Sequence, residues 1–106
     1  MPPSMDAIAN FFRVGDYNIT VHGYEELDND SITIENLELA IGQDKPEIIE
    51  DYPTDARGAS CLILGWCQTT VPIHVCVSIS GDKPEVITAY RPNPKYFLPP
   101  YFRQRR

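Results

Sequence analysis

The feature that most constrains the fold is a set of four strand-like segments in the second half of the chain, at residues 46–52, 59–67, 72–80 and 84–90. In each of them, apolar and polar residues alternate with a period close to two, which is typical of β-strands. The connections between the last three segments are short and polar, which favours β-hairpins. We therefore expect a four-stranded, mainly antiparallel sheet.

The first half of the chain has the residue spacing of helices. Ser4 is a suitable N-cap for a helix whose apolar residues recur every three or four positions. A further helix is predicted to begin at a cap formed by Ser31 or Thr33. Between these two helices, residues 17–22 form a short strand or an extended link, and residues 23–30 form a short helix. Helices followed by strands predict an α+β fold, with the helices packed on one face of the sheet.

The length of 106 residues is that of one domain. We place this domain at residues 1–98 and assign residues 99–106 to a C-terminal tail. Nothing in the sequence approaches the roughly 18 consecutive apolar residues of a membrane span, and the first residues lack the pattern of a signal peptide. We expect a cytoplasmic protein with no membrane partner.

The C-terminal stretch "RPNPKYFLPPYFRQRR" combines proline, aromatic and basic residues. Proline lacks the backbone donor that a central strand requires, so the tail is expected to lie extended along the domain or to project from it. Its mixture of aromatic and basic side chains is suited to stacking bases and holding phosphates. A docking segment for a protein partner and a flexible end are the alternatives.

The net charge of −6 is unevenly distributed along the chain. Residues 1–55 contain 13 Asp and Glu against 2 Lys and Arg, a balance of −11, whereas residues 56–106 contain 2 against 7, a balance of +5. This division predicts an acidic helical layer and a basic end of the sheet. The basic half is able to hold an anion such as phosphate, while the overall charge argues against strong non-specific binding to nucleic acid.

Three cysteines, Cys61, Cys67 and Cys76, lie in apolar strand-like segments, and no pair has the C-x-x-C spacing. Packed free thiols are the favoured interpretation, with a disulfide or a zinc site formed by Cys61, Cys67 and His74 as alternatives. The sequence contains neither a glycine-rich nucleotide-binding loop nor a G-x-S-x-G elbow. We therefore expect no cofactor, no metal and no Ser-His-Asp hydrolase.

His74 lies at the centre of the strand-like segment "TVPIHVCVSIS". Because side chains alternate across a strand, Ile73 and Val75 share the core face, and His74 shares the opposite face with Cys76 and Ser78. We expect this opposite face to be left open by the helices. An imidazole there titrates near neutral pH, which suits general acid or base catalysis. An ordinary surface histidine is the alternative.

Three stretches, "EIIEDYPTDARGASCLILGW", "VPIHVCVSI" and "VITAYRPNPKYF", resemble a family of small prokaryotic domains known as domain-of-unknown-function family 4258. The resemblance covers roughly residues 19–97. That family is similar to the RelE and BrnT type of toxin, in which helices pack on an antiparallel sheet. Many such toxins cleave RNA and are blocked by an antitoxin encoded beside them. The resemblance thus implies a RelE-like fold, an endoribonuclease, and RNA and a cognate antitoxin as partners.

The first half of the chain departs from the pattern of this family, which reads H-A-x-x-R-M followed by a second arginine. His22 matches the histidine, but Glu26 and Asp30 stand where the two arginines are expected. This reversal of charge favours the alternative function, a non-catalytic relative that acts as a protein-binding module.

Metal-free cleavage of RNA requires a base, an acid and a cation that stabilises the phosphorane. His74 is the candidate acid or base, and His22 is a second candidate. Arg57 and Arg91 are candidate phosphate ligands, because arginine offers a bidentate fork. An ordinary loop charge is the alternative for Arg57. The remaining candidates for binding RNA are Tyr90, Lys95 and Tyr96, and a packed strand end is the alternative for Tyr90.

Overall fold

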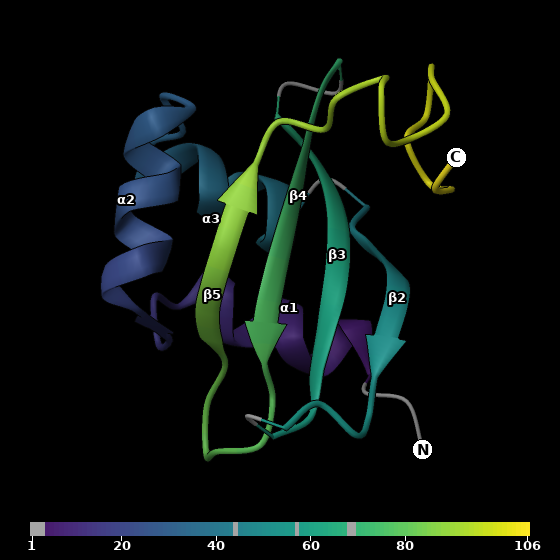
Figure 1. Cartoon of the computed structure of the whole chain (residues 1–106). Helices are drawn as coiled ribbons and strands as arrows, with labels where there is room; N and C mark the ends of the chain where they lie inside the picture. Colours follow the sequence, from purple (N-terminus) through teal and green to yellow (C-terminus); the bar gives the residue numbers. More distant parts are fainter. Residues whose placement is uncertain (1–3, 44, 57, 68–69) are drawn as a thin grey trace.

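The computed structural model describes residues 4–43, 45–56, 58–67 and 70–106, which form three helices and a five-stranded sheet (Figure 1). The helices are α1 (Met5–Arg13), α2 (Val21–Asn29) and α3 (Ile34–Gly42). The strands are β1 (Asn18–Ile19), β2 (Glu47–Tyr52), β3 (Ser60–Cys67), β4 (Val71–Ser78) and β5 (Glu85–Tyr90). The predicted α+β class is confirmed. In the described part of the chain, every helix is too short or too polar to cross a membrane.

Each helix begins at a hydroxyl side chain that caps its first turn. The side-chain oxygens of Ser4, Thr20 and Thr33 each accept a hydrogen bond from the backbone N–H three residues further on, which satisfies a donor that the helix leaves unpaired. The predicted cap at Ser4 is confirmed, and Thr33 rather than Ser31 caps α3. Because Thr20 caps α2, this helix begins at Val21 instead of residue 23.

The strand order across the sheet is β1-β5-β4-β3-β2. The four long strands pair antiparallel in sequence order, as the short connections predicted. The prediction of four strands is wrong by one, because β1 pairs in parallel with β5 and makes the sheet mixed. β1 lies within residues 17–22, where a short strand or an extended link was expected, and its two residues are too few for an alternating pattern to place it in the sheet.

One face of the sheet packs against α1 and α3, which lie behind the strands in the view of Figure 1. Ile73, Val75 and Val77 point toward this layer and are fully buried, as the alternation predicted. Burial of such a side chain stabilises the fold by about 1.5–3 kcal/mol. Gly65 permits the close approach of α3, because a Cβ atom at this position would lie 2.6 Å from the backbone oxygen of Ala40.

The alternation of β5 is interrupted by a bulge opposite Cys76 and Val77. The extra residue, Ile87, places both Val86 and Ala89 on the buried helix face. It leaves Tyr90 directly opposite His74, on the other face. The alternating pattern of β5 did not show which of its residues share a sheet face with His74. The bulge explains this, because it shifts the alternation within the strand.

The last residues of the chain fold back on themselves beside the upper ends of β2 and β3, on the face that α1 and α3 do not cover (Figure 1). Backbone hydrogen bonds join Leu98 N–H to Gln104 O (2.8 Å) and Arg106 N–H to Tyr96 O (2.9 Å). We call residues 96–106 the C-terminal segment. It packs on the sheet rather than projecting from it, and its Phe97 is only 2% exposed.

Candidate functional site

His74 lies on the face of β4 opposite α1 and α3, as predicted from the alternation, but it is fully buried. Its ring packs edge-on against Phe97, with ring centroids 4.4 Å apart, and against Tyr90, with centroids 5.3 Å apart. The expectation that this face is open around His74 is therefore wrong. The C-terminal segment covers the histidine, in a packing between distant parts of the chain that strand alternation does not reveal.

Both ring nitrogens of His74 have partners. Nε2 lies 3.0 Å from the backbone oxygen of Phe102 and donates to it, so in the neutral ring Nδ1 is the acceptor for the Tyr90 hydroxyl at 3.3 Å. Burial lowers the pKa of His74 to about 4, although the hydrogen bond to Phe102 opposes this shift. At neutral pH, His74 is an uncharged link between β4, Tyr90 and the C-terminal segment.

His22 lies in the first turn of α2, away from His74. Its side chain is 60% exposed, its Nε2 is 3.6 Å from the Glu26 carboxylate, and it lines a cleft of about 300 Å³ together with Ser78. Ser78 is four residues from His74 along β4, or about 13 Å at the rise of a strand. The structure therefore does not bring the two histidines together.

Arg91 is engaged with the C-terminal end of α2. Its backbone N–H donates to the Asp30 carboxylate at 2.7 Å, and its guanidinium donates to the backbone oxygens of Asp30 (3.0 Å) and Ser31 (3.5 Å). A cation at this position pairs with the carbonyl groups that a helix end leaves free. Asp30 thus has a structural partner in this chain.

The remaining predicted RNA-binding residues are scattered. Lys95 and Tyr96 are exposed, with the Lys95 ammonium 5.8 Å from the centre of the Tyr96 ring. Tyr90 is half-buried against His74, so it occupies the packed strand end that was its alternative. Arg57 lies outside the described residues.

A charged cluster that was not predicted lies beside the covered histidine. Glu50, on β2, accepts two hydrogen bonds from the Arg105 guanidinium, at 2.6 and 3.0 Å, and a third from the Tyr52 hydroxyl. We call Glu50, Tyr52 and Arg105 the Glu50 cluster. Arg105 belongs to the C-terminal segment, and its side chain is 54% exposed, against 20% for Glu50. The cluster therefore places an ion pair at the solvent boundary.

Electrostatic interactions connect this cluster to His74 and Tyr90. Burial alone would raise the pKa of Glu50, but the hydrogen bonds from Arg105 and Tyr52 lower it below its ordinary value. The same contacts raise the pKa of Arg105. Burial raises the pKa of Tyr90 to about 12. At neutral pH, the site thus holds one carboxylate, one guanidinium, two neutral phenols and one neutral imidazole.

The sequence contained part of the signal for this cluster. Glu50 and Tyr52 lie two residues apart on one strand, in the stretch "EIIEDYP", so their side chains share a face. Arg105 is 55 residues from Glu50. Because that pairing depends on the fold of the C-terminal segment, only Glu50 and Tyr52 could be grouped from the sequence.

The described residues form no group of three or more His, Cys, Asp or Glu side chains close enough to hold a metal ion. Cys61 and Cys67 occupy the helix face of β3, whereas His74 occupies the opposite face. The zinc site considered for these three residues is therefore wrong. All three cysteines are reduced thiols, and burial raises the pKa of Cys61 to about 12.

Comparison with models of known protein families identifies the family of this chain. The chain belongs to the family described as Domain of unknown function (DUF4258), whose model matches residues 19–91. Neither the curated proteins nor the solved structures contain a significant match. The matched range includes Glu50, Tyr52, His74 and Tyr90, and it ends before Arg105 and the rest of the C-terminal segment.

Proposed function

We propose that this protein is a toxin-like endoribonuclease that cleaves RNA by general acid–base chemistry and acts in the cytoplasm. The observation that supports it best is the Glu50 cluster, which joins a carboxylate to a guanidinium at the solvent boundary of a sheet face. A sheet with α1 and α3 on one face and a charged cluster on the other supports a likeness to RelE and BrnT toxins. That likeness remains part of the proposal.

The proposed reaction is an internal transesterification of the RNA backbone. Glu50 takes the proton of a ribose 2′-hydroxyl, the resulting oxygen attacks the adjacent phosphorus, and the 5′-oxygen leaves with a proton. The products are a 2′,3′-cyclic phosphate and a free 5′-hydroxyl. Arg105 stabilises the charge that develops on the phosphorane, for which its fork of N–H donors is suited.

The resting contact between Glu50 and Arg105 suggests how substrate would prepare the base. Arg105 and Tyr52 hold the pKa of Glu50 low in the free protein. A substrate phosphate that draws Arg105 away removes hydrogen bonds from the carboxylate, so the pKa of Glu50 rises and the group becomes a stronger base. Tyr52 is the neighbouring hydroxyl that can protonate the leaving oxygen.

A role of His74 as acid or base remains a prediction from the sequence. Because His74 is buried and both of its nitrogens are engaged, we instead give it a positioning role in the proposed reaction. It fixes Tyr90 and the backbone of Phe102, and thereby the segment that carries Arg105.

The test is a cleavage assay on single-stranded RNA with product ends identified by mass spectrometry. Glu50→Gln is expected to slow cleavage about 10²–10⁴-fold, the range for loss of a general base. Asp51→Asn is the matched control, since it removes the same charge from the next residue of β2, on the opposite face. A wild-type protein that leaves RNA intact would refute the function, and cleavage lost in His74→Gln but kept in Glu50→Gln would reassign the base to the histidine.

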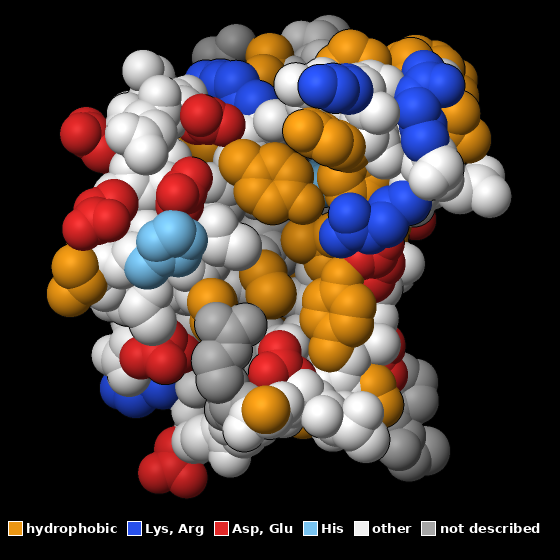
Figure 2. All heavy atoms as spheres, viewed as in Figure 1, with side chains coloured by type: hydrophobic (Ala, Val, Ile, Leu, Met, Phe, Trp, Pro, Cys, Tyr) orange, Lys and Arg blue, Asp and Glu red, His pale blue; other side chains and the backbone are white. Residues whose placement is uncertain are grey.

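A second candidate function is a protein-binding module, which the surface of α2 favours. Figure 2 shows acidic side chains gathered over this helix, which contains Glu25, Glu26 and Asp28 but no Lys or Arg. Val21 and Tyr24 are 77% and 56% exposed on the same helix. A basic partner with apolar anchors, such as a cognate antitoxin, would fit this surface. Co-purification with the product of the neighbouring gene, lost on Tyr24→Ala, would support it.

A further inference from the structure

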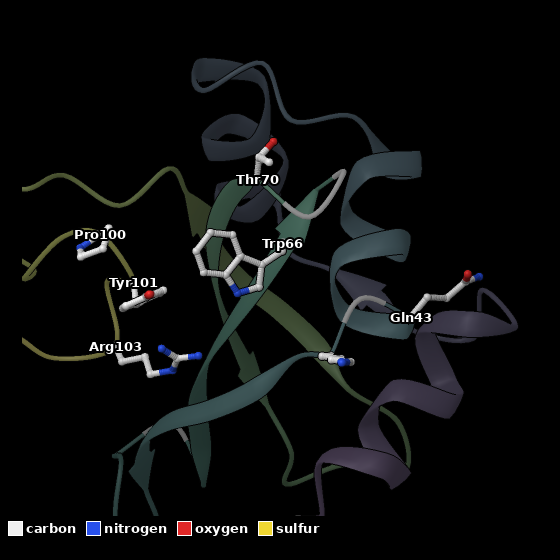
Figure 3. A pocket seen from close by; sticks show the side chains of 7 residues that line it. Gln43, Trp66, Thr70, Pro100, Tyr101 and Arg103 are labelled. Atoms are coloured by element: carbon white, nitrogen blue, oxygen red, sulfur yellow. The ribbon is translucent and has the colours of Figure 1, made fainter.

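A cleft of about 700 Å³ lies between the end of β3 and the C-terminal segment. Trp66 lies in its centre, with Tyr101 and Arg103 on the side of the C-terminal segment (Figure 3). Lys45 and Pro100 complete this part of the lining. None of these five residues belongs to the Glu50 cluster.

The cleft offers aromatic surfaces that are accessible from solvent. Tyr101 is 59% exposed, and Trp66, the single tryptophan of the chain, is half-buried. The Arg103 guanidinium lies 5.1 Å from the centre of the Tyr101 ring. Aromatic faces and guanidinium planes are the groups on which proteins stack unpaired bases.

The charge of the cleft is opposite to that of the molecule as a whole. Lys45 and Arg103 line it, and no Asp or Glu does among the described residues, although the chain carries a net charge of −6. Glu47 accepts a hydrogen bond from the Nε of Arg103, which holds the side chain in place while the planar fork has further donors. Figure 2 shows Lys and Arg side chains gathered at the end of the molecule where Figure 1 places the C-terminal segment. An anionic ligand with an aromatic group matches this lining.

We propose that the cleft binds one nucleotide of single-stranded RNA, with its base on Trp66 and Tyr101 and its phosphate at Arg103 and Lys45. This inference rests on the proposed function, because it supplies a substrate-binding subsite for that reaction. Trp66 and Leu62 share a face of β3, and Leu62 pairs with Glu50. Four residues of strand separate them by about 13 Å, so the subsite would hold a nucleotide close to the one that is cleaved.

The test uses the fluorescence of Trp66 as a reporter inside the proposed subsite. The probe is a short 2′-O-methyl oligoribonucleotide, which lacks the free 2′-hydroxyl and cannot be cleaved by the proposed route. We expect saturable quenching of Trp66 by this probe and none by an abasic oligonucleotide of the same length. Absence of quenching, or equal quenching by the abasic strand, would overturn the proposal. A base-paired duplex that quenches as well as the single strand would also overturn it.

Two variants and a matched control assign the contacts. Tyr101→Ala and Arg103→Gln are each expected to weaken binding about tenfold, in the range of a lost stacking contact. Lys83→Gln is the control, because it removes a positive charge from the connection after β4, whereas Trp66 pairs with Pro72 at the start of β4. This variant should bind the probe as the wild type does. Circular dichroism checks that the variants fold. Tyr101→Ala and Arg103→Gln variants that fold and bind normally would refute the assignment.

This binding test and the cleavage assay fail independently. Cleavage of RNA without quenching of Trp66 would support the nuclease function and refute the nucleotide-binding subsite. Quenching by the base-bearing probe without cleavage would leave a nucleotide-binding protein and eliminate the nuclease. In a protein with both properties, Arg103→Gln should raise KM and leave kcat nearly unchanged, since the contact holds equally in ground state and transition state.

Discussion

Burial of His74 predicts that the protein loses stability as the pH falls from 7 to 5. In the folded protein the pKa of His74 is about 4, whereas its ordinary value is 6.5. Between these values the unfolded chain binds a proton that the folded chain does not, so acid favours unfolding. The stabilisation is fully present above pH 6.5 and is lost progressively as the pH approaches 4.

The magnitude follows from the two pKa values. Their separation of 2.5 units corresponds to a loss of about 3 kcal/mol once the pH lies below both. At pH 5, about 2 kcal/mol of this is already lost. With a urea m value of about 2 kcal/mol/M, the unfolding midpoint should shift by about 1 M between pH 7 and pH 5.

The assay is urea unfolding followed by Trp66 fluorescence at a series of pH values, for the wild type and for His74→Gln. The glutamine amide keeps a donor for Phe102 but does not titrate. We expect the variant to be less stable at pH 7 by about 1–2 kcal/mol, and its disadvantage to shrink toward pH 5. Other titrating groups are common to both proteins and cancel in the difference. A constant difference between the two proteins from pH 7 to pH 5 would refute the reasoning.

Two further predictions concern packing. Gly65→Ala should destabilise the fold by about 1–3 kcal/mol, since the new methyl group would lie 2.6 Å from the backbone oxygen of Ala40. Gly81→Ala is the control, because the nearest atom to its new methyl group is 3.9 Å away. Equal urea unfolding midpoints for the two variants would contradict this prediction. Phe97→Ala should cost about 3 kcal/mol, because the ring is 2% exposed. It should also move the His74 pKa toward 6.5, measured by NMR titration, and an unchanged pKa would show that Phe97 does not cause the burial.

The sheet was predictable where a local pattern determines the structure. Alternation over eight residues assigned both faces of β4, and the buried Ile73, Val75 and Val77 follow from it directly. The same rule failed at β5, where one bulged residue shifts every later side chain to the other face. It also could not decide between a strand and an extended link for residues 17–22, because the two residues of β1 are ordered by pairing with β5 rather than by a pattern of their own.

The candidate site was only half predictable, because its parts are far apart in the chain. The histidine was found from its strand, but its burial depends on Phe97 and Phe102, residues that no periodicity places above it. The tail was recognised as aromatic and basic. That it would fold back and supply Arg105 to Glu50 depends on packing over the whole domain.

The C-terminal segment determines what the sheet face of this family member can do. The family match ends at Arg91, and Phe97 and Phe102, which contact His74 from outside the sheet, both lie beyond it. The same segment supplies the cation of the Glu50 cluster and one side of the cleft around Trp66. It therefore removes the histidine from solvent while it adds a charged cluster and an aromatic cleft beside it. Any reaction on this face would thus depend on groups that the segment brings to the surface, and not on His74, the strand residue that the sequence singles out.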